Sequence, residues 1–300
     1  MFLSFLTLLF LLLVIMGFAR VVRYFWDWLR GGEKVDEDSV RMESAAEEHA
    51  EEVADRELAG FEAEDRPDQV KTVVRASSDV IGAYLDEMKL GWFQVAIIFF
   101  IGCIAGLLIE EIWMLITAGL TENRVGLVWG PFSPLYGFGS VFLTVVSFEL
   151  RKHGAKNWQV FLAAALIGGL LEQVTGWSME TLFNATSWSY SHLPDHITKW
   201  VAWRFLVFWG LLGLVWCRAV MPVLLYRIGM LTSKRQLVFV VLLSVYLVAD
   251  IVMTMACFNR KTARDEGVPA QNAFEEWVDE NYTDEFIANR FQNLVIGDSQ

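Results

Sequence analysis

The sequence predicts an all-α protein: a polytopic membrane helix bundle of about six spans with an acidic N-terminal linker. Three observations predict this fold. Hydrophobic residues make up 55% of the 300-residue chain, which contains 22 Phe and 13 Trp. The apolar residues gather into runs of about 20, the length that a helix needs to cross the hydrocarbon core of a bilayer. The formal net charge of −12 lies mainly in polar stretches outside these runs. An acidic chain of this kind argues against a nucleic-acid partner.

The first apolar run predicts an N-terminal transmembrane anchor within residues 1–30. No cation precedes the run at 2–19, whereas Arg20, Arg23 and Arg30 follow it. A cleavable signal peptide has the opposite charge order, so we expect a retained anchor with a cytoplasmic C-terminal end. The other candidate spans are residues 92–117, 134–149, 158–183, 200–221 and 237–257.

Polar segments separate the anchor from the other spans and follow the last one. Residues 31–90 form an acidic linker, in which the Ala- and Glu-rich segment 40–64 favours a helix. That segment lacks a strong apolar stripe, so we predict a solvated helix or a partly disordered linker, with a folded partner domain as the alternative. Residues 91–258 then form a membrane bundle of five spans, and residues 259–300 an acidic polar C-terminal tail.

Cations in the loops predict the topology, because short loops rich in Lys and Arg stay cytoplasmic. The loops at 151–156 and 227–235 carry three cations each by this reading, whereas those at 119–130 and 184–199 carry one each and are expected outside. Six spans then place both ends outside. Cations directly after the last run conflict with that result, so either the tail breaks the rule or one run is re-entrant; they are Arg260, Lys261 and Arg264.

The stretch from Asn123 to Gly139 mixes glycines and prolines with large aromatic side chains and a single cation, Arg124. Non-helical backbone at membrane depth persists only when it is packed in protein or lines a wet cavity. We therefore expect a shaped, partly buried connection here, with a rigid helix start at Pro134. The residues expected to shape it are Gly130, Pro131, Pro134, Gly137 and Gly139.

Several ionisable residues lie inside the apolar runs, where each costs roughly 2.5–3.5 kcal/mol and usually faces protein or water. Glu172 and Glu180 are eight positions apart, so both can line one side of a helix. The pattern predicts a polar pocket or pathway in the outer half of the bundle. Its candidate residues are Glu110, Glu172, Glu180, Arg124, Asn123, Arg204 and Tyr136.

Other interpretations of these charges stay open. The groups can pair with one another and hold helices together, or they can snorkel to the interface, above all Glu111, Glu180 and Arg204. Asn123 and Arg124 can equally form a simple external turn. If the pocket exists, we expect Arg124 to lie within salt-bridge reach of Glu110, Glu122 or Glu180.

Cofactor and metal sites are not expected. Cys103, Cys217 and Cys257 lie in apolar runs without paired spacing, which is typical of buried thiols. The four His are scattered over polar segments. The chain has no phosphate-binding Gly-x-x-x-x-Gly-Lys loop, no Gly-x-Ser-x-Gly, no His-Glu-x-x-His and no dinucleotide fingerprint. Catalytic residues are accordingly not assigned.

Five motifs together resemble one family. They are Gly106 with Glu110, Asn123–Arg124, the run GPFSPLYGFG at 130–139, the run EQVTGWSMETLF at 172–183, and WSYS at 188–191. Across residues 91–295 they resemble the family of putative ABC-transporter permeases, the type IV integral membrane proteins of bacteria. Val125 stands where that family has glycine, one extra residue precedes Gly130, and Ser189 replaces an aspartate.

The resemblance implies a permease-like transport subunit in the cell membrane, with multiple spans and a Glu-lined polar site. An ABC permease needs a separate ATPase subunit, so the expected partners are the lipid bilayer, such an ATPase and further copies of the chain. The alternative is a non-transporting scaffold or sensor that recruits a partner through its acidic flanks. A third reading, an intramembrane enzyme, lacks a clear nucleophile–base pair.

Overall fold

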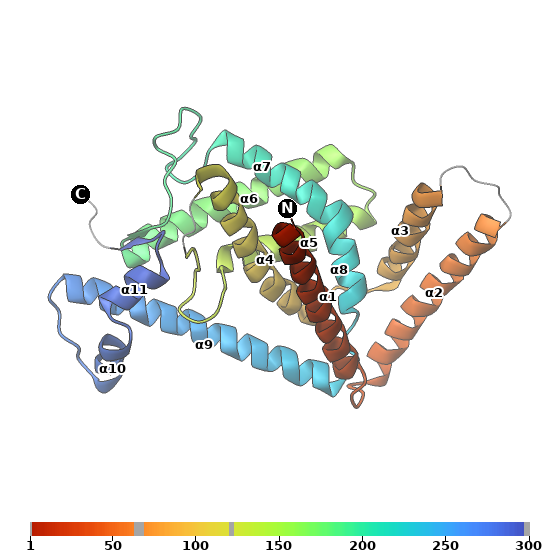
Figure 1. The fold of residues 1–300 in the computed structure, drawn as a ribbon, viewed down its shortest axis with the longest axis horizontal. Helices are drawn as coiled ribbons and strands as arrows, with labels where there is room; N and C mark the ends of the chain where they lie inside the picture. Colours follow the sequence, from red (N-terminus) through yellow and green to blue (C-terminus); the bar gives the residue numbers. More distant parts are fainter. Residues whose placement is uncertain (1, 63–68, 120–122, 297–300) are drawn as a thin grey trace. The chain divides into compact units, whose positions relative to one another are not determined.

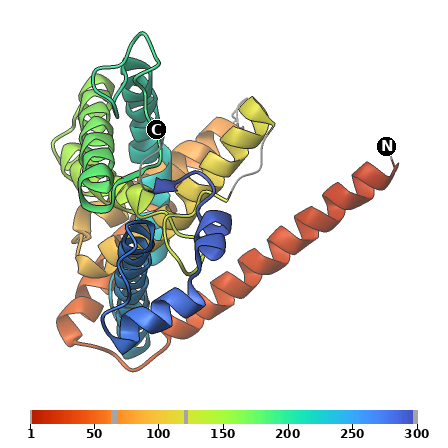
Figure 2. The ribbon, with the colours of Figure 1, turned by 90° about the vertical axis from the view of Figure 1, so that its left-hand side faces the viewer.

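A computed structural model describes residues 2–62, 69–119 and 123–296, and this part of the chain is predominantly helical (Figure 1). The first long helix, α1, is uninterrupted (Figure 2). The helices are α1 (Phe2–Arg30), α2 (Glu37–Glu62), α3 (Gln69–Glu87), α4 (Trp92–Ala118), α5 (Pro134–Lys152), α6 (Asn157–Phe183), α7 (Trp203–Val215), α8 (Met221–Ile228), α9 (Lys234–Asp265), α10 (Ala273–Asn281) and α11 (Asp284–Arg290). A π-helical turn, η1 (Trp216–Val220), and two short strands, β1 (Ala185–Thr186) and β2 (Val295–Ile296), complete the order.

Within the described residues, four helices are long and apolar enough to cross a membrane: Trp92–Thr117, Asn157–Leu182, Trp203–Ile228 and Lys234–Asp265. They correspond to the predicted runs at 92–117, 158–183, 200–221 and 237–257. The remaining two runs, at 2–19 and 134–149, fall within helices α1 and α5. The all-α prediction is thus confirmed, and four of the expected spans have candidates in the structure.

The chain divides into two compact units, residues 1–88 with 229–243, and residues 89–228 with 244–300. The first unit is organised around the buried carboxylate of Glu43. That group accepts hydrogen bonds from Arg30 Nη2 at 2.6 Å, from the Tyr84 hydroxyl at 2.6 Å and from the backbone N–H of Met230 at 3.0 Å. Burial, together with the neighbouring Glu43 charge, raises the pKa of Tyr84. The described parts of the predicted linker are therefore helices, α2 and α3, tied to α1 by one carboxylate.

The start of α9 is fixed by a reciprocal cap in the same unit. Ser233 Oγ accepts from Gln236 N–H, and Gln236 Oε1 accepts from Ser233 N–H, at 3.1 Å each. This capping box satisfies two amides that the helix start would otherwise leave unbonded. The Ser233 hydroxyl also donates to the carbonyl of Leu29.

In the second unit, glycines allow helices α4 and α5 to approach closely. A Cβ at Gly102 would lie 1.9 Å from Ser140 Oγ, and one at Gly106 would lie 2.2 Å from Tyr136 Cβ. The Gly-x-x-x-Gly spacing of α4 therefore presents a smooth surface to α5, as this spacing does in membrane helices. On the other side, Gly137 of α5 leaves room for Cys103.

Helix α6 packs along α7 by the same means, since Gly168 lies against the indole of Trp209 and Gly213 lies against Ala164. The chain of α7 continues through η1 into α8, where Pro222 lacks the N–H that an α-helix needs. The wider π-turn absorbs this defect, because the N–H of Met221 bonds to the carbonyl of Trp216, five positions back. The helix therefore reaches Ile228, seven residues beyond the predicted end of the run at 221.

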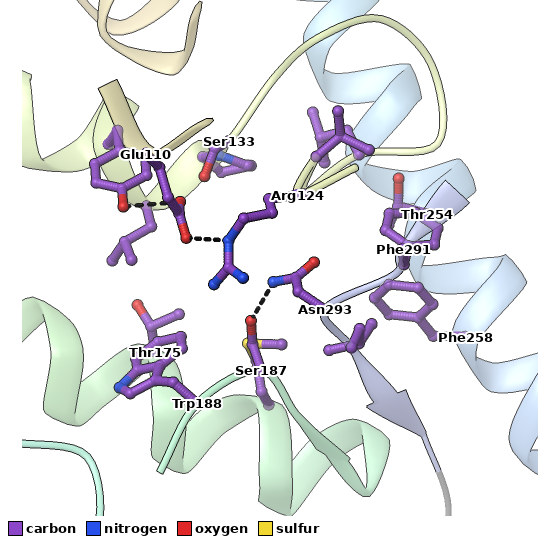
Figure 3. Close-up of a pocket in the computed structure, with 18 of the residues that line it drawn as sticks. Glu110, Arg124, Ser133, Thr175, Ser187, Trp188, Thr254, Phe258, Phe291 and Asn293 are labelled. Carbon is purple, nitrogen blue, oxygen red and sulfur yellow. Dashed lines mark hydrogen bonds and ion pairs between the residues drawn. The ribbon is translucent and has the colours of Figure 1, made fainter. Parts of the chain in front are cut away.

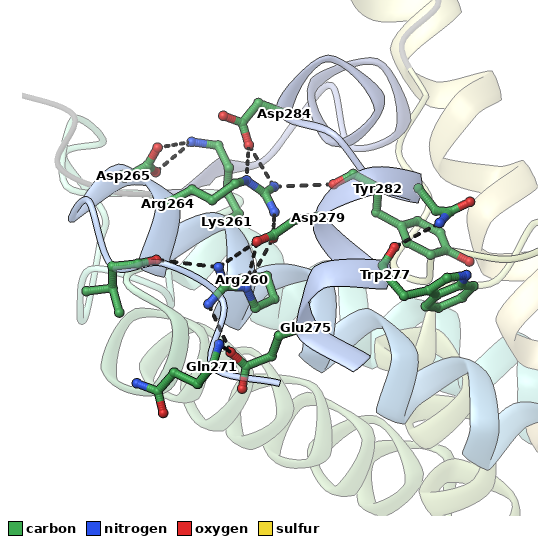
Figure 4. Close-up of polar contacts among 12 residues, drawn as sticks. Arg260, Lys261, Arg264, Asp265, Gln271, Glu275, Trp277, Asp279, Tyr282 and Asp284 are labelled. Atoms are coloured by element: carbon green, nitrogen blue, oxygen red, sulfur yellow. Dashed lines mark hydrogen bonds and ion pairs between the residues drawn. The ribbon is translucent and has the colours of Figure 1, made fainter. Parts of the chain in front are cut away.

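The C-terminal segment folds onto the second unit. Asn272 and Thr283 cap α10 and α11 with their side chains. β2 pairs antiparallel with β1, so that Val295 lies opposite Thr186. Figure 4 shows the ion-pair network that joins the end of α9 to α10 and α11, built from Arg260, Arg264, Glu275, Asp279 and Asp284.

Candidate functional site

The second unit contains a cavity of about 550 Å³ (Figure 3). Its walls come from α4, the connection after α4, α5, α6, the segment after β1, α9 and the C-terminal segment. The lining residues are Glu110, Arg124, Val125, Gly126, Leu127, Ser133, Pro134, Leu135, Tyr136, Phe138, Glu172, Thr175, Met179, Leu182, Ser187, Trp188, Tyr190, Ile251, Thr254, Met255, Phe258, Phe291, Asn293 and Leu294. More than half of them are apolar, and the charged ones are Glu110, Arg124 and Glu172.

Glu110 is the centre of one polar cluster in this lining. Its Oε1 accepts a hydrogen bond from Arg124 Nε at 2.6 Å, and its Oε2 accepts one from the Tyr136 hydroxyl at 2.8 Å. Both members of the ion pair are mostly buried, with 16% of the Arg124 side chain and 22% of the Glu110 side chain exposed. The backbone N–H of Arg124 bonds to Glu111. The sequence prediction that Arg124 reaches Glu110 is thus confirmed; Glu122, another predicted partner, lies outside the described residues.

Glu172 supplies a second carboxylate to the lining, from α6. It is 7% exposed. Oε1 accepts from the indole Nε1–H of Trp209 at 3.1 Å, whereas Oε2 is buried and has no hydrogen-bond partner within the described part of the chain. Tyr190 lies beside it, and burial followed by the Glu172 charge raises the pKa of the Tyr190 phenol. Glu172 thus faces the cavity with one carboxylate oxygen already bonded.

The connection between α4 and α5 takes its shape from a few residues. Gly130 has φ of +68°, a left-handed conformation that favours glycine. The N–H of Gly126 donates to the carbonyl of Phe132 at 2.7 Å, which closes the loop on itself. Pro134 then occupies the first turn of α5, as predicted. Val125, where the resembling family has glycine, is buried in an apolar cluster and needs no positive φ.

Side chains from α9 and the C-terminal segment satisfy the amides and carbonyls of this connection. Val128 N–H donates to Thr254 Oγ1 and Trp129 N–H donates to Asp250 Oδ1, both at 2.9 Å. Arg290 donates from Nη2 to the carbonyl of Leu127 at 3.1 Å and also to that of Gly130. Burial lowers the pKa of this arginine, and its neighbour Asp250 opposes the shift. The irregular backbone is therefore packed in protein, as its predicted depth requires.

Not every predicted site residue lies in the cavity. Glu180 pairs with Lys199 at 2.6 Å and is half exposed, and Arg204 pairs with Asp195 at 2.7 Å. The hydrogen bonds from Arg204 lower the pKa of Asp195. Asn123 is bonded through its backbone to Gln292. The structure thus brings Glu110, Arg124, Tyr136 and Glu172 together, and leaves Glu180 and Arg204 outside this lining.

The loop-shaping candidates differ in their surroundings. Pro131 is exposed, whereas Gly137 and Gly139 are buried in α5. A Cβ at Gly137 would meet Cys103 Sγ at 2.5 Å, and one at Gly139 would meet the Trp209 ring at 3.3 Å. These two glycines thus act in helix packing rather than in the connection itself.

Sequence reasoning missed the residues that complete the cavity from distant parts of the chain. Phe291 and Asn293 line it from the C-terminal segment, and Asn293 Nδ2 donates to Ser187 Oγ at 2.7 Å (Figure 3). Thr254 lines it from α9. The one available signal was the spacing of apolar residues near the end of the chain, at Phe286, Ile287, Phe291 and Leu294, which pack on the core cluster around Val128.

Within the described ranges, no group of three or more His, Cys, Asp or Glu side chains is placed to hold a metal ion. The three cysteines are buried as free thiols.

The chain matches the family described as "Putative ABC-transporter type IV" over residues 97–255, more than half of its length. A search among curated proteins and a search among solved structures each returned no match. The matched range contains Glu110, Arg124, Tyr136 and Glu172, together with the connection from Asn123 to Gly139. The chain therefore belongs to this family of type IV ABC-transporter proteins.

Proposed function

We propose that the protein is a membrane transport subunit and that the cavity around Glu110, Arg124 and Glu172 is its substrate site or part of its pathway. The family match and the four apolar helices support a membrane transport protein. The single observation that carries the site is the cavity of about 550 Å³, a volume typical of small-molecule sites. The three charged side chains of its described lining come from separate elements, namely α4, the connection after α4, and α6.

The burial of these groups favours a binding role over interfacial snorkelling. Glu172 is 7% exposed within the protein, and the Arg124–Glu110 pair is less than a quarter exposed. Glu110 also has a structural role, because its hydrogen bond with Tyr136 joins α4 to α5. A purely structural role would not require an open cavity beside the Arg124–Glu110 pair.

We also propose six spans in the cell membrane, with α1 and α5 crossing in addition to the four candidates. Both helices fall on predicted apolar runs, and α5 ends in Arg151 and Lys152, cations typical of a cytoplasmic end. Cysteines introduced at His153 and Ser191 would report the two sides. Labelling of both from the same side of intact cells would refute this topology.

ATP hydrolysis would come from a separate subunit, because this chain has no phosphate-binding loop. The alternative function is a scaffold or sensor that recruits a partner through its acidic flanks. The exposed acids of α2, such as Glu48, Glu51 and Glu52, are the feature that favours it.

Purification of the full chain from its native membrane tests the two functions. The transport proposal expects an ATPase subunit that stays bound through two affinity steps and hydrolyses ATP in the complex. Recovery of a signalling or envelope protein, without an ATPase, would favour the scaffold. With an ATPase in hand, Glu110→Gln and Glu172→Gln are expected to change ATP hydrolysis or its response to substrate, whereas the exposed Glu149→Gln on α5 is the matched control.

A further inference from the structure

Glu172 has an unmet bonding requirement at the cavity wall. Its side chain is more than nine-tenths buried; Oε1 accepts from the indole of Trp209, and the phenol of Tyr190 lies beside the carboxylate. Oε2 has no hydrogen-bond partner in the described residues. A buried carboxylate oxygen without a donor costs free energy comparable to a lost charged hydrogen bond. A ligand that places a positive charge against this oxygen would offset the cost.

The charges of the lining also leave a negative balance. Arg124, the basic residue among the described lining residues, is 2.6 Å from Glu110, which neutralises that carboxylate. Tyr136 donates to the same glutamate. Glu172 is the other acid of the lining, and none of the ion pairs among the described residues involves it. An anionic ligand would therefore meet a like charge at Glu172, whereas a cation would be attracted.

The rest of the wall suits an apolar body. Aromatic side chains line it from several elements, including Phe138, Trp188, Phe258 and Phe291. Aromatic faces attract quaternary and protonated amines, by roughly 0.5–2 kcal/mol for each ring. Leu135 and Met179 add further apolar side chains to the lining.

We propose that the cavity binds an organic ammonium ion with an apolar body, and that its positive nitrogen lies against the free oxygen of Glu172. The proposal rests on the proposed transport function and names the ligand class of the same site. Arg124 and Glu110 pair with each other and do not supply the binding charge.

Two probes of equal shape isolate the charge. Benzyltrimethylammonium carries a permanent positive charge, and neopentylbenzene is its uncharged carbon isostere. Calorimetric titration of the purified full chain in a detergent without ammonium groups is expected to show that the cation binds at least about tenfold tighter than the isostere. That ratio corresponds to about 1.4 kcal/mol of electrostatic attraction between the cation and the carboxylate. Equal affinities, or no binding of either probe to the wild-type protein, would overturn the proposal.

The variant Glu172→Gln tests whether Glu172 is the residue that causes the preference for the cation. The variant is expected to bind neopentylbenzene as before, which also reports an intact cavity, and to lose the preference for the cation. Glu149→Gln makes the same chemical change on an exposed site outside the lining and should keep the preference. If Glu172→Gln loses both probes, Glu172→Asp replaces it and must retain the cation preference. A preference that survives in Glu172→Gln rules out the assignment.

Two sources carry this chemistry, a free organic amine and the ammonium headgroup of a phospholipid. Displacement of benzyltrimethylammonium by lysophosphatidylethanolamine, but not by lysophosphatidylglycerol, identifies the lipid source. Displacement by phenethylamine alone identifies the free amine. The binding assay needs no ATPase, so a failed titration beside a co-purified ATPase would remove the ligand class and leave the transport function standing.

Discussion

Glu110 accepts hydrogen bonds from both Arg124 and Tyr136, so a single carboxylate joins α4, the connection after it, and α5. The partners use separate oxygens, which lets both bonds form together. Removal of one partner leaves the other group partly buried with less compensation. We therefore expect substitutions within this cluster to have strongly coupled effects on the free energy of unfolding.

A double-mutant cycle on Glu110→Gln and Arg124→Gln measures this coupling. Each single change is expected to lower the free energy of unfolding by about 1–3 kcal/mol, with a coupling energy of about 1–2 kcal/mol, because the pair is mostly buried. Reversible unfolding in mixed micelles provides the measurement. The more exposed pair Arg204–Asp195 is the control and should couple less strongly than the pair Arg124–Glu110. Equal coupling in the two pairs would contradict the role given to Glu110.

The sequence predicted part of this site and not the rest, for a physical reason. Charged residues inside apolar runs are conspicuous, so Glu110, Arg124 and Glu172 could be selected from sequence alone. Trp209 could not, because a tryptophan in a membrane run has many roles besides donating to a carboxylate. Glu180 and Arg204 were selected by the same rule, yet each has a nearby partner in a loop, Lys199 and Asp195.

At the scale of elements, apolar runs predicted the helices well and their ends less well. Pro134 marked the start of α5 because proline suits the first helical turn. The helix through η1 passed its predicted end because the π-turn accommodates Pro222, and no hydrophobic pattern signals such a turn. The Gly102–Gly106 spacing of α4 is explained by the close approach of Ser140 and Tyr136.

Gly106→Ala tests this packing. The new Cβ would lie 2.2 Å from both Cβ and Cγ of Tyr136, near the backbone end of that side chain, so α4 and α5 must separate. We expect a loss of about 1–3 kcal/mol in the free energy of unfolding, the usual cost of overpacking. Gly17→Ala in α1 is the matched control, since nothing lies within 4 Å of its Cβ. That change should be neutral or stabilising, because alanine favours helices. Equal effects at both positions would argue against the contact.

Asp279 of α10 is expected to make the stability of the protein depend on pH. Hydrogen bonds from Arg260 and then Arg264 lower the pKa of this carboxyl below its usual 3.8. A lowered native pKa means that the contribution to stability is fully present above about pH 3.8. It is lost as the pH falls through the native pKa.

Asp279→Asn should therefore lower the melting temperature at pH 7 by about 2–4 °C, an effect of about 1 kcal/mol, and should flatten its fall below pH 3.8. Thermal melts between pH 2 and 7 measure both effects. Glu280→Gln makes a similar change at an exposed neighbour and should leave the profile as it is. An Asp279→Asn profile parallel to the wild type would exclude this role.

For the whole molecule, composition predicted a predominantly helical protein with apolar helices long enough to cross a membrane, and the described residues contain four such candidates. The sequence predicted an acidic polar C-terminal tail at 259–300 and assigned no helix or strand to residues 273–296. That segment carries α10, α11 and β2, with Val278, Ile287 and Phe291 buried. Its helices are short and their apolar residues few, so the burial depends on long-range contacts that local patterns do not reveal.

Arg290 tests how this segment holds the connection after α4. Its guanidinium bonds the carbonyls of Leu127 and Gly130, which lie in irregular backbone. Arg290→Gln is expected to raise amide hydrogen exchange in residues 123–130 by about tenfold, the equivalent of 1.4 kcal/mol of lost local stability. Exchange in α6 should change little. Arg227→Gln, at an exposed position on α8, is the matched control. Unchanged exchange at 123–130 would show that this backbone keeps its conformation without Arg290.

The bonds between the connection and the C-terminal segment also set an order of assembly. Asn123 and Gln292 are 169 positions apart, and Ser187 and Asn293 are 106 apart. Such distant pairs carry a large loop-closure entropy and form after local ones. During synthesis, α4 to α9 leave the ribosome before Phe291 and Asn293 do. The helices can therefore enter the bilayer before the cavity has its last wall, and a chain interrupted ahead of residue 287 would have the helices of the site without an enclosed volume to bind a ligand.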